Sequence, residues 1–469
     1  MSNQIRLDVN AMMAEYVGPK GIARAELDAL VPELKKAHAA VEAGRGVDMQ
    51  GWMDLPYNQE EILGKIEASA ARIRAEFDAF VVLGIGGSAL GPAAVQQALN
   101  HLHYNELPAE KRGGPRLYIE DNIDPERMAA LMDVIDLKKT CVNVITKSGG
   151  TAETMSQYLI VTEALKAQLG DEWKKHILIT TSEKKGFLIK IAQREGFETF
   201  YIPDGVGGRF SELCPVGLVP AACCGIDIRA LLAGAAAMDA RCKSDDMMKN
   251  PALLEAVLQY IACEQMGRNI QVMLPYADSL KYMADWFCQL WAESLGKNVK
   301  RDGTPCHAGQ TPAKALGVTD QHSQLQLYNE GPFDKVITFI KVEKFRTETK
   351  IPHGCEQFKD VAFLGGMTHN TLIEAERQGT EYALYVNRRM NQTIVMPEVN
   401  AYTLGQLLFF MEMATAYEGE LLNIDAFNQP GVETSKRATY AILGNTDAKY
   451  DAARQEMTGR PAFKTEYIL

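Results

Sequence analysis

The chain has 469 residues, with 49 lysines and arginines against 60 aspartates and glutamates, for a formal net charge of -11. This length suits two or three domains, and the acidic balance argues against a nucleic-acid-binding protein, which usually presents a basic face to phosphates. The longest weakly polar stretch, residues 213–226, is too short for a bilayer and contains two prolines. We therefore expect no membrane span.

The first 50 residues have apolar positions at helical spacing, among them Leu27, Val31 and Leu34. They contain no charged segment followed by an apolar one, as a secretion signal would. The nine cysteines include no CxxC pair and no cluster with histidines, so neither a disulfide framework nor a metal site is predicted. We expect a helical N-terminal segment in a cytoplasmic protein.

Residues 78–202 alternate short apolar runs with amphipathic stretches. Strands are predicted at 79–84, 116–120, 140–146, 176–181 and 198–202, and helices at 92–102, 125–134, 152–168 and 184–194. Continuous apolar strands separated by helices indicate parallel strands covered on both faces, hence a doubly wound α/β sheet.

The same alternation restarts after about residue 225. Helices are predicted at 252–266, 278–296 and 404–418, and strands at 269–274, 335–342 and 392–396. The pattern predicts a second α/β domain, with a cleft between the two. The last segment, 437–469, is polar, and its expected role is to wrap around a neighbouring molecule.

Two glycine-rich loops follow predicted strands. The first is GIGGSALGP at 84–92, which contains Gly87 and Ser88; the second is TKSGGT at 146–151, with three hydroxyls. Each leads into a helix, whose N-terminus offers free N–H groups to an anion. Either loop alone could be a tight turn, but two on neighbouring strand ends indicate one ligand at the carboxyl edge of the sheet. A phosphomonoester suits Ser88 better than a dinucleotide, because no acidic residue follows at the spacing that a nicotinamide dinucleotide needs.

The predicted helix 278–296 is apolar over most of its circumference, but Asp285, Gln289, Glu293 and Lys297 form a polar stripe at i, i+4 spacing. One interpretation is a solvent-facing seam with a Glu293–Lys297 ion pair, and periodicity alone favours it slightly. The other is a carboxylate held in a pocket, where it acts as a general base.

Three further residues are candidates for chemistry. Arg209 lies in the turn GGRFS, and its rigid fork of donors suits a developing oxyanion. His322 lies in the polar stretch TDQHSQ, and histidine titrates near neutrality. Lys436 follows the turn QPGVETS. Each alone has an ordinary alternative as a surface residue.

Together the motifs GIGGSALGP, TKSGGTAET, GGRFS, QLWAESLGK, DQHSQLQL with EGP, and QPGVETSK occur in chain order between residues 84 and 436. This set resembles the glucose-6-phosphate isomerase family. The resemblance implies an aldose–ketose isomerase of glycolysis and gluconeogenesis that interconverts glucose 6-phosphate and fructose 6-phosphate through a cis-enediol. It also implies two sugar-isomerase (SIS) domains and no metal or other cofactor. Thr146, where the family often has Ser, and the additional glycines of the second loop are departures that remove no catalytic group.

The resemblance further implies residue roles. The residues implied to bind the substrate are Gly87, Ser88, Thr146, Lys147, Ser148, Thr151, Gln289 and Gln429. Those implied to act in catalysis are Glu293 as the base, Arg209 as the enediolate-stabilising group, and His322 and Lys436 as the ring-opening pair. Glu153 is implied to orient the histidine. Since the family histidine comes from the partner subunit, a homodimer is implied, with His322 of the partner subunit completing each site.

We expect four parts of the chain: 1–50, a helical segment that packs on the second domain; 51–222, the first SIS domain with the phosphate loops; 223–430, the second SIS domain; and 431–469, the segment with Lys436. Two other functions compete with the isomerase. A non-catalytic phosphosugar-binding SIS protein could lack Glu293, Arg209 or His322, and all three are present. A nicotinamide dehydrogenase would need the acidic partner that the first loop lacks.

Overall fold

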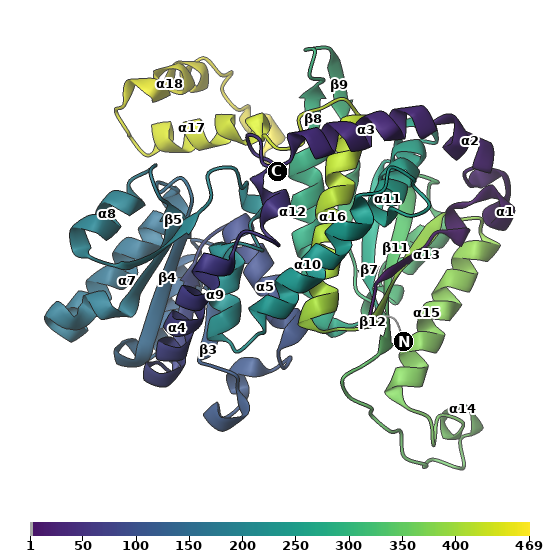
Figure 1. Ribbon diagram of the computed structural model, residues 1–469, viewed down its shortest axis with the longest axis horizontal. Coiled ribbons are helices and arrows are strands. Elements are labelled where there is room, and N and C mark those ends of the chain that lie inside the picture. Colours follow the sequence, from purple (N-terminus) through teal and green to yellow (C-terminus); the bar gives the residue numbers. More distant parts are fainter. Residues whose placement is uncertain (1–2) are drawn as a thin grey trace.

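Two α/β halves lie side by side in the computed structural model, which describes residues 3–469 (Figure 1). Each half is built around a five-stranded sheet, and nearly all strand pairs are parallel. The predicted fold class, two mostly parallel doubly wound domains, is confirmed. Among residues 3–469, no helix combines the length and the apolar character that a membrane crossing requires.

The first sheet has the strand order β3-β2-β4-β5-β6, and every neighbouring pair is parallel. Its strands are β2 (Ala79–Leu83), β3 (Arg116–Glu120), β4 (Thr140–Thr146), β5 (Ile177–Ser182) and β6 (Glu198–Ile202). All five were predicted, because each is a short run rich in β-branched or apolar residues, as strands covered on both faces are.

Helices cover both faces of this sheet. Alternate residues of β2 point to opposite sides: Phe80 and Val82 join one hydrophobic cluster, and Val81 and Leu83 join another. The first cluster contains residues of α4 (Glu60–Glu76), α5 (Gly87–Leu99) and α9 (Pro215–Cys223). The second contains residues of α6 (Pro125–Val134), α7 (Ala152–Leu169) and α8 (Leu188–Glu195).

The second sheet has the order β1-β12-β11-β7-β10, in which only β1 is antiparallel to its neighbour. Its strands are β1 (Arg6–Asp8), β7 (Ile270–Pro275), β10 (Thr311–Lys314), β11 (Lys335–Lys344) and β12 (Asn391–Glu398). One face packs on α10 (Ile228–Cys242), α11 (Pro251–Tyr260), α12 (Lys281–Leu295) and α16 (Ala401–Leu421), and the other on α13 (Leu325–Glu330) and α15 (His369–Val386).

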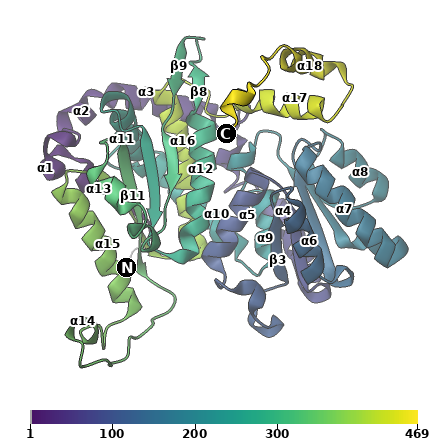
Figure 2. The same cartoon turned by 180° about the vertical axis from the view of Figure 1, so that it is seen from behind.

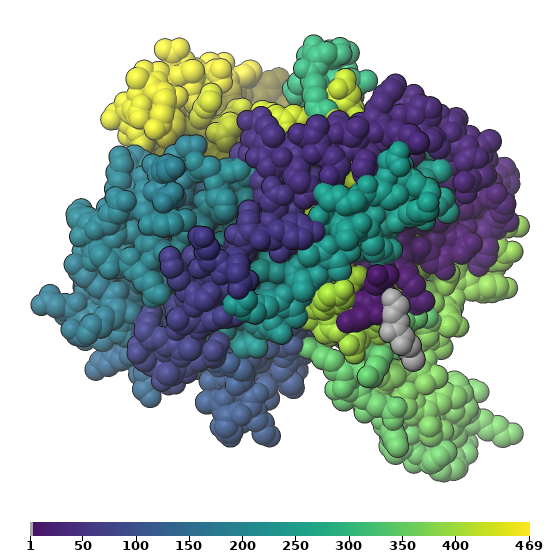
Figure 3. Space-filling model, in the orientation of Figure 1, coloured from purple at the N-terminus to yellow at the C-terminus, as the bar shows by residue number. Residues whose placement is uncertain are grey.

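The remaining elements lie at the ends of the chain and in excursions. The N-terminal helices are α1 (Ala14–Val17), α2 (Arg24–Ala29) and α3 (Val31–Gly44), and α3 packs on α16. The strands β8 (Lys297–Val299) and β9 (Pro305–Ala308) form a hairpin, and α14 (Lys359–Ala362) lies in a projecting segment (Figure 2). The C-terminal helices α17 (Glu433–Ile442) and α18 (Asp451–Thr458) pack on each other and lie against the first half (Figure 3). The four-part division of the chain stays a prediction.

Several boundaries differ from those predicted. Helix α5 begins at Gly87 instead of residue 92, because the amides of Ala89 and Leu90 donate to the Gly86 carbonyl and close a helical turn before Pro92. Helix α8 begins at Leu188 instead of residue 184, since Gly186 has φ +94°, outside helical geometry. The N-terminal segment was predicted to be helical throughout; that prediction was wrong at β1, a three-residue edge strand without an apolar run.

Candidate active site

The two predicted anion loops meet at the carboxyl edge of the first sheet. Strands β2 and β4 are neighbours, yet the chain leaves β2 for α5 on one face and leaves β4 for α7 on the other. This reversal is a topological switch point, the place where open α/β sheets bind ligands. The sheet therefore brings the N-termini of two helices to one site.

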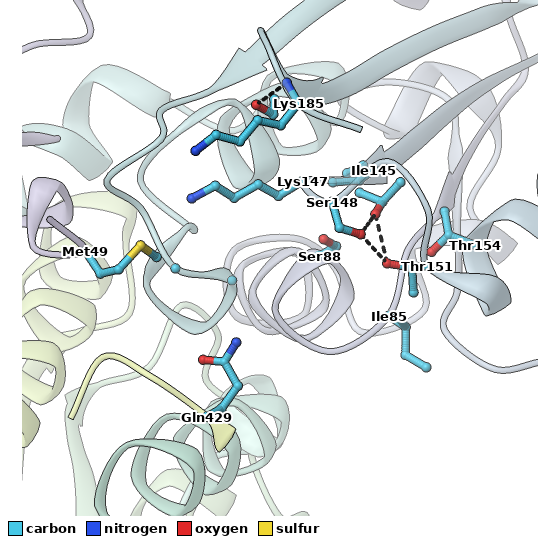
Figure 4. Close-up of a pocket in the computed structure, with 14 residues that line it drawn as sticks. Met49, Ile85, Ser88, Ile145, Lys147, Ser148, Thr151, Thr154, Lys185 and Gln429 are labelled. Carbon is cyan, nitrogen blue, oxygen red and sulfur yellow. Dashed lines mark hydrogen bonds between the residues drawn. The ribbon is translucent and has the colours of Figure 1, made fainter. Parts of the chain in front are cut away.

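Hydroxyl groups converge at this edge. The Oγ1 atoms of Thr146 and Thr151 lie 2.9 Å apart, and Ser148 Oγ lies 3.3 Å from the first and 3.1 Å from the second. We call these three residues and Ser88 the hydroxyl cup. It lines a pocket of about 380 Å³ in which Ser148 and Thr151 face Ser88, with Gln429 on the far side (Figure 4). Hydroxyls and helix N-termini suit a phosphate group.

Gly87 brings the turn with Arg209 to the hydroxyl cup. A Cβ atom at Gly87 would lie 2.0 Å from the carbonyl oxygen of Gly208 and 2.8 Å from the amide nitrogen of Arg209. Only glycine allows this approach of two backbones. The arginine turn, a short 3-10 helix at Gly208–Phe210, is thereby held against the start of α5.

Arg209 is 3% exposed, and each of its side-chain nitrogens donates a hydrogen bond. Nε donates to Ser294 Oγ (2.7 Å), Nη1 to Glu293 Oε2 (3.2 Å), and Nη2 to a backbone carbonyl, that of Ala426 (2.6 Å). Burial lowers the pKa of Arg209, and the nearby Glu293 carboxylate opposes that lowering. Since an arginine stays protonated in proteins, the guanidinium is a fixed positive group.

Glu293 lies in the last turn of α12, and its side chain is 33% exposed. It accepts hydrogen bonds from Arg209 and, at 3.3 Å, from Gln289 Nε2 one turn earlier. The alternative interpretation, an ion pair with Lys297, was wrong. Within residues 3–469 the Lys297 ammonium forms no salt bridge to Glu293 and instead donates to two backbone carbonyls, because it lies just beyond the helix end.

Gln429 connects the hydroxyl cup to the arginine. It lines the pocket of the cup, and its Oε1 accepts a hydrogen bond from Arg209 Nη1 at 3.2 Å. Helix α5, which starts at the cup, also packs along α12. Ser88, Gln429, Arg209 and Glu293 thus form one continuous site between the two halves.

Lys147 has a side chain that stabilises the neighbouring loop. Its ammonium donates to the carbonyls of Asp204 and of Val206, the latter at 2.7 Å. Burial lowers the pKa of Lys147. Its side-chain donors are therefore directed to the segment that precedes Arg209.

Three predicted residues, Lys436, His322 and Glu153, do not line the pocket of the hydroxyl cup. Lys436, on α17, forms an exposed ion pair with Glu433 (2.9 Å) and borders a different hollow. His322 is exposed at the end of a 3-10 helix, Thr319–Gln321, in the second half. Glu153 is partly buried in the first turn of α7. Within residues 3–469, no histidine lines the pocket of the hydroxyl cup.

Comparison with known proteins identifies the family. A family model described as phosphoglucose isomerase matches residues 64–458. The chain belongs to the phosphoglucose isomerase family. The glucose-6-phosphate isomerase of Carboxydothermus hydrogenoformans is 51% identical over 453 residues, and the match covers 97% of each chain. The resemblance that the six motifs indicated is confirmed.

The fold of this chain also matches solved structures. A hypothetical protein from Thermus thermophilus superposes with a TM-score of 0.85 at 36% identity, covering 94% of this chain and 100% of that one. A glucose-6-phosphate isomerase from Chlamydia trachomatis gives a TM-score of 0.74 at 25% identity, covering 87% of this chain and 77% of that one.

The pocket of this phosphoglucose isomerase family member contains residues that sequence reasoning missed. Ser182, the last residue of β5, and Lys185, three residues beyond it, line the pocket at the edge next to β4. Thr154 and Met49 line it as well, and Figure 4 shows both of them together with Lys185. The stretch TTSEKKG, which begins in the last residues of β5 and continues into the loop, was the available signal, because it puts a third polar segment at the same carboxyl edge. Met49 comes from a distant segment, and no local pattern pointed to it.

Proposed function

We propose that the chain interconverts glucose 6-phosphate and fructose 6-phosphate as an aldose–ketose isomerase. The observation that carries the proposal is the buried guanidinium of Arg209, which contacts both Glu293 and the Gln429 side chain that lines the hydroxyl cup. A base and a fixed cation beside a phosphate site are the groups that proton transfer through an enediol requires.

The phosphate binds in the hydroxyl cup. Ser88, Thr146, Ser148 and Thr151 contact its oxygens. The backbone N–H groups of Gly87, at the start of α5, and of Lys147, in the loop after β4, add donors. The phosphate takes no part in bond changes. Its binding energy instead fixes the reacting carbons against Glu293, as a remote handle does.

Glu293 transfers the proton between C2 and C1. As the carboxylate it removes the proton from one carbon, and as the acid it returns that proton to the other across a cis-enediol. Such general acid–base catalysis contributes roughly 10²–10⁴-fold. Negative charge develops on the enediol oxygens, and Arg209 stabilises it with donors held in place by Ser294 and by backbone carbonyls. Gln289 and Gln429 orient the sugar.

Ring opening requires one proton to be removed and another to be delivered. We assign these steps to Lys436 and to the partner subunit's His322, with Glu153 as the group that orients the histidine. The exposed position of His322 and the absence of a histidine from the cup pocket of residues 3–469 support a shared site. The active form is then a homodimer.

The reaction moves hydrogen within one molecule, so it balances without a redox cofactor. We further propose that the enzyme acts in the cytoplasm. All nine cysteines are free thiols, and most are buried, which suits a reducing compartment.

The direct test is incubation of the purified protein with fructose 6-phosphate and no added cofactor. We expect glucose 6-phosphate to form at the same rate with and without NAD or a chelator. Formation only in the presence of NAD, or no formation at all, would overturn the proposal.

A further inference from the structure

Lys297 is a buried lysine that no step above uses. It is the first residue of β8, two residues beyond the end of α12, and is 7% exposed. Its Nζ donates to the backbone carbonyl of Glu293 at 2.7 Å and to that of Ser294 at 2.7 Å. The last carbonyls of a helix lack intrahelical donors, and a cation at this end also interacts favourably with the helix dipole.

The two residues whose carbonyls Lys297 binds both accept side-chain hydrogen bonds from Arg209. Ser294 Oγ accepts from Arg209 Nε at 2.7 Å, and Glu293 Oε2 accepts from Arg209 Nη1 at 3.2 Å. One ammonium therefore fixes the backbone of two residues. Glu293 is the proposed base, and Ser294 supports Arg209, the proposed enediolate-stabilising group. A helix end without this cation is free to fray.

We propose that Lys297 is a positioning residue for Glu293 and Arg209, and that its positive charge is needed for full turnover. The inference rests on the proposed isomerase function. It assigns Lys297 no contact with the substrate: its effect passes through the last turn of α12.

The groups around Lys297 bring the pKa of its ammonium into the pH range in which turnover can be measured. The charged groups that face it are Arg209, Glu293 on α12 and Asp425 after α16, and His307 of β9 borders the same hollow. Burial lowers the pKa of Lys297 to about 8, and the Arg209 guanidinium adds to the lowering. Turnover should therefore fall as the pH rises past that value. A neutral amine still donates hydrogen bonds, but charge-assisted ones are stronger.

The test compares wild type, Lys297→Met, Lys297→Arg and the control Lys300→Met, an exposed lysine of the same hairpin. Steady-state kinetics with fructose 6-phosphate are measured from pH 6 to pH 10, and folding is checked by circular dichroism. For Lys297→Met we expect kcat to fall about 10- to 100-fold with KM nearly unchanged, since hydrogen bonds to charged groups are worth that much. Lys300→Met should match wild type.

Lys297→Arg is the decisive variant, because a guanidinium keeps its charge at every pH tested. The hollow of about 540 Å³ beside Lys297 offers it space. We expect the alkaline fall of kcat to move upward by at least about one pH unit. A folded Lys297→Met with wild-type kcat, or an alkaline limb that Lys297→Arg leaves in place, would overturn the inference. If Lys297→Met does not fold, the Lys297→Arg profile decides. An inactive wild type would instead count against the proposed function.

Discussion

At the scale of single residues, the site depends on the geometry of one guanidinium. Arg209 uses its planar fork to contact Ser294, Glu293 and Gln429 at once. A lysine offers a point charge and cannot reach three partners in this arrangement. Arg209→Lys should therefore lower kcat about 10²–10³-fold, the usual loss when an oxyanion-stabilising donor is removed, and should raise KM much less.

The matched control is Arg229→Lys, an exposed arginine that pairs with Glu60 and Glu67. Steady-state kinetics with fructose 6-phosphate check both variants. An effect of Arg209→Lys on KM alone would assign Arg209 to ground-state binding of the sugar and remove it from enediolate stabilisation.

At the scale of elements, helix α16 contains a buried glutamate, Glu412, with a carboxyl oxygen that is unpaired within the described part of the chain. Glu412 is 1% exposed, and among residues 3–469 its Oε1 has no hydrogen-bond partner. Burial raises the pKa of Glu412 well above its usual value, and the neighbouring carboxyl of Glu212 adds to the rise. Above the unfolded pKa, the folded state binds a proton that the unfolded state has lost, so the free energy of unfolding decreases as the pH rises.

Glu412→Gln removes this titration. We expect the variant to gain stability over wild type between about pH 5 and pH 8, by at most about 1.4 kcal/mol per pH unit, as measured by denaturant unfolding at several pH values. The control Glu61→Gln changes an exposed glutamate of α4 and should leave the pH dependence unchanged. Equal slopes for wild type and Glu412→Gln would contradict the assignment of this pH dependence to Glu412.

Some of these elements could be predicted from the sequence, and others could not. The buried strands β2, β4 and β5 are local apolar runs, and the hydroxyl cup follows because parallel strands bring their carboxyl ends to one edge. The partners of Arg209 could not be predicted from local sequence patterns, since Ser294 and Gln429 are 85 and 220 residues away along the chain. Lys297 was mispredicted for a different reason. Its i, i+4 spacing from Glu293 predicted an ion pair within a helix, but α12 ends before Lys297 and leaves its last carbonyls free to accept from the ammonium.

At the scale of the whole molecule, the site is a local exception to the overall charge. A formal net charge of -11 does not attract a sugar phosphate at long range. Binding must therefore depend on nearby donors: two helix N-termini, the hydroxyl cup and Arg209. Among the described residues no histidine lines the cup pocket, and our proposal assigns the ring-opening histidine to the partner subunit's His322.

The central claim is that one isomerase site contains Glu293 of one subunit and His322 of the other. Glu293→Gln and His322→Ala are each expected to lower kcat, the first by about 10²–10⁴-fold, with binding of fructose 6-phosphate largely retained.

The decisive measurement mixes the two variants in equal amounts, exchanges their subunits and assays isomerisation of fructose 6-phosphate. We expect recovery of about a quarter of wild-type activity, because half of the dimers are mixed and each has one intact site. No recovery after verified subunit exchange, or near-wild-type turnover by Glu293→Gln alone, would contradict the account.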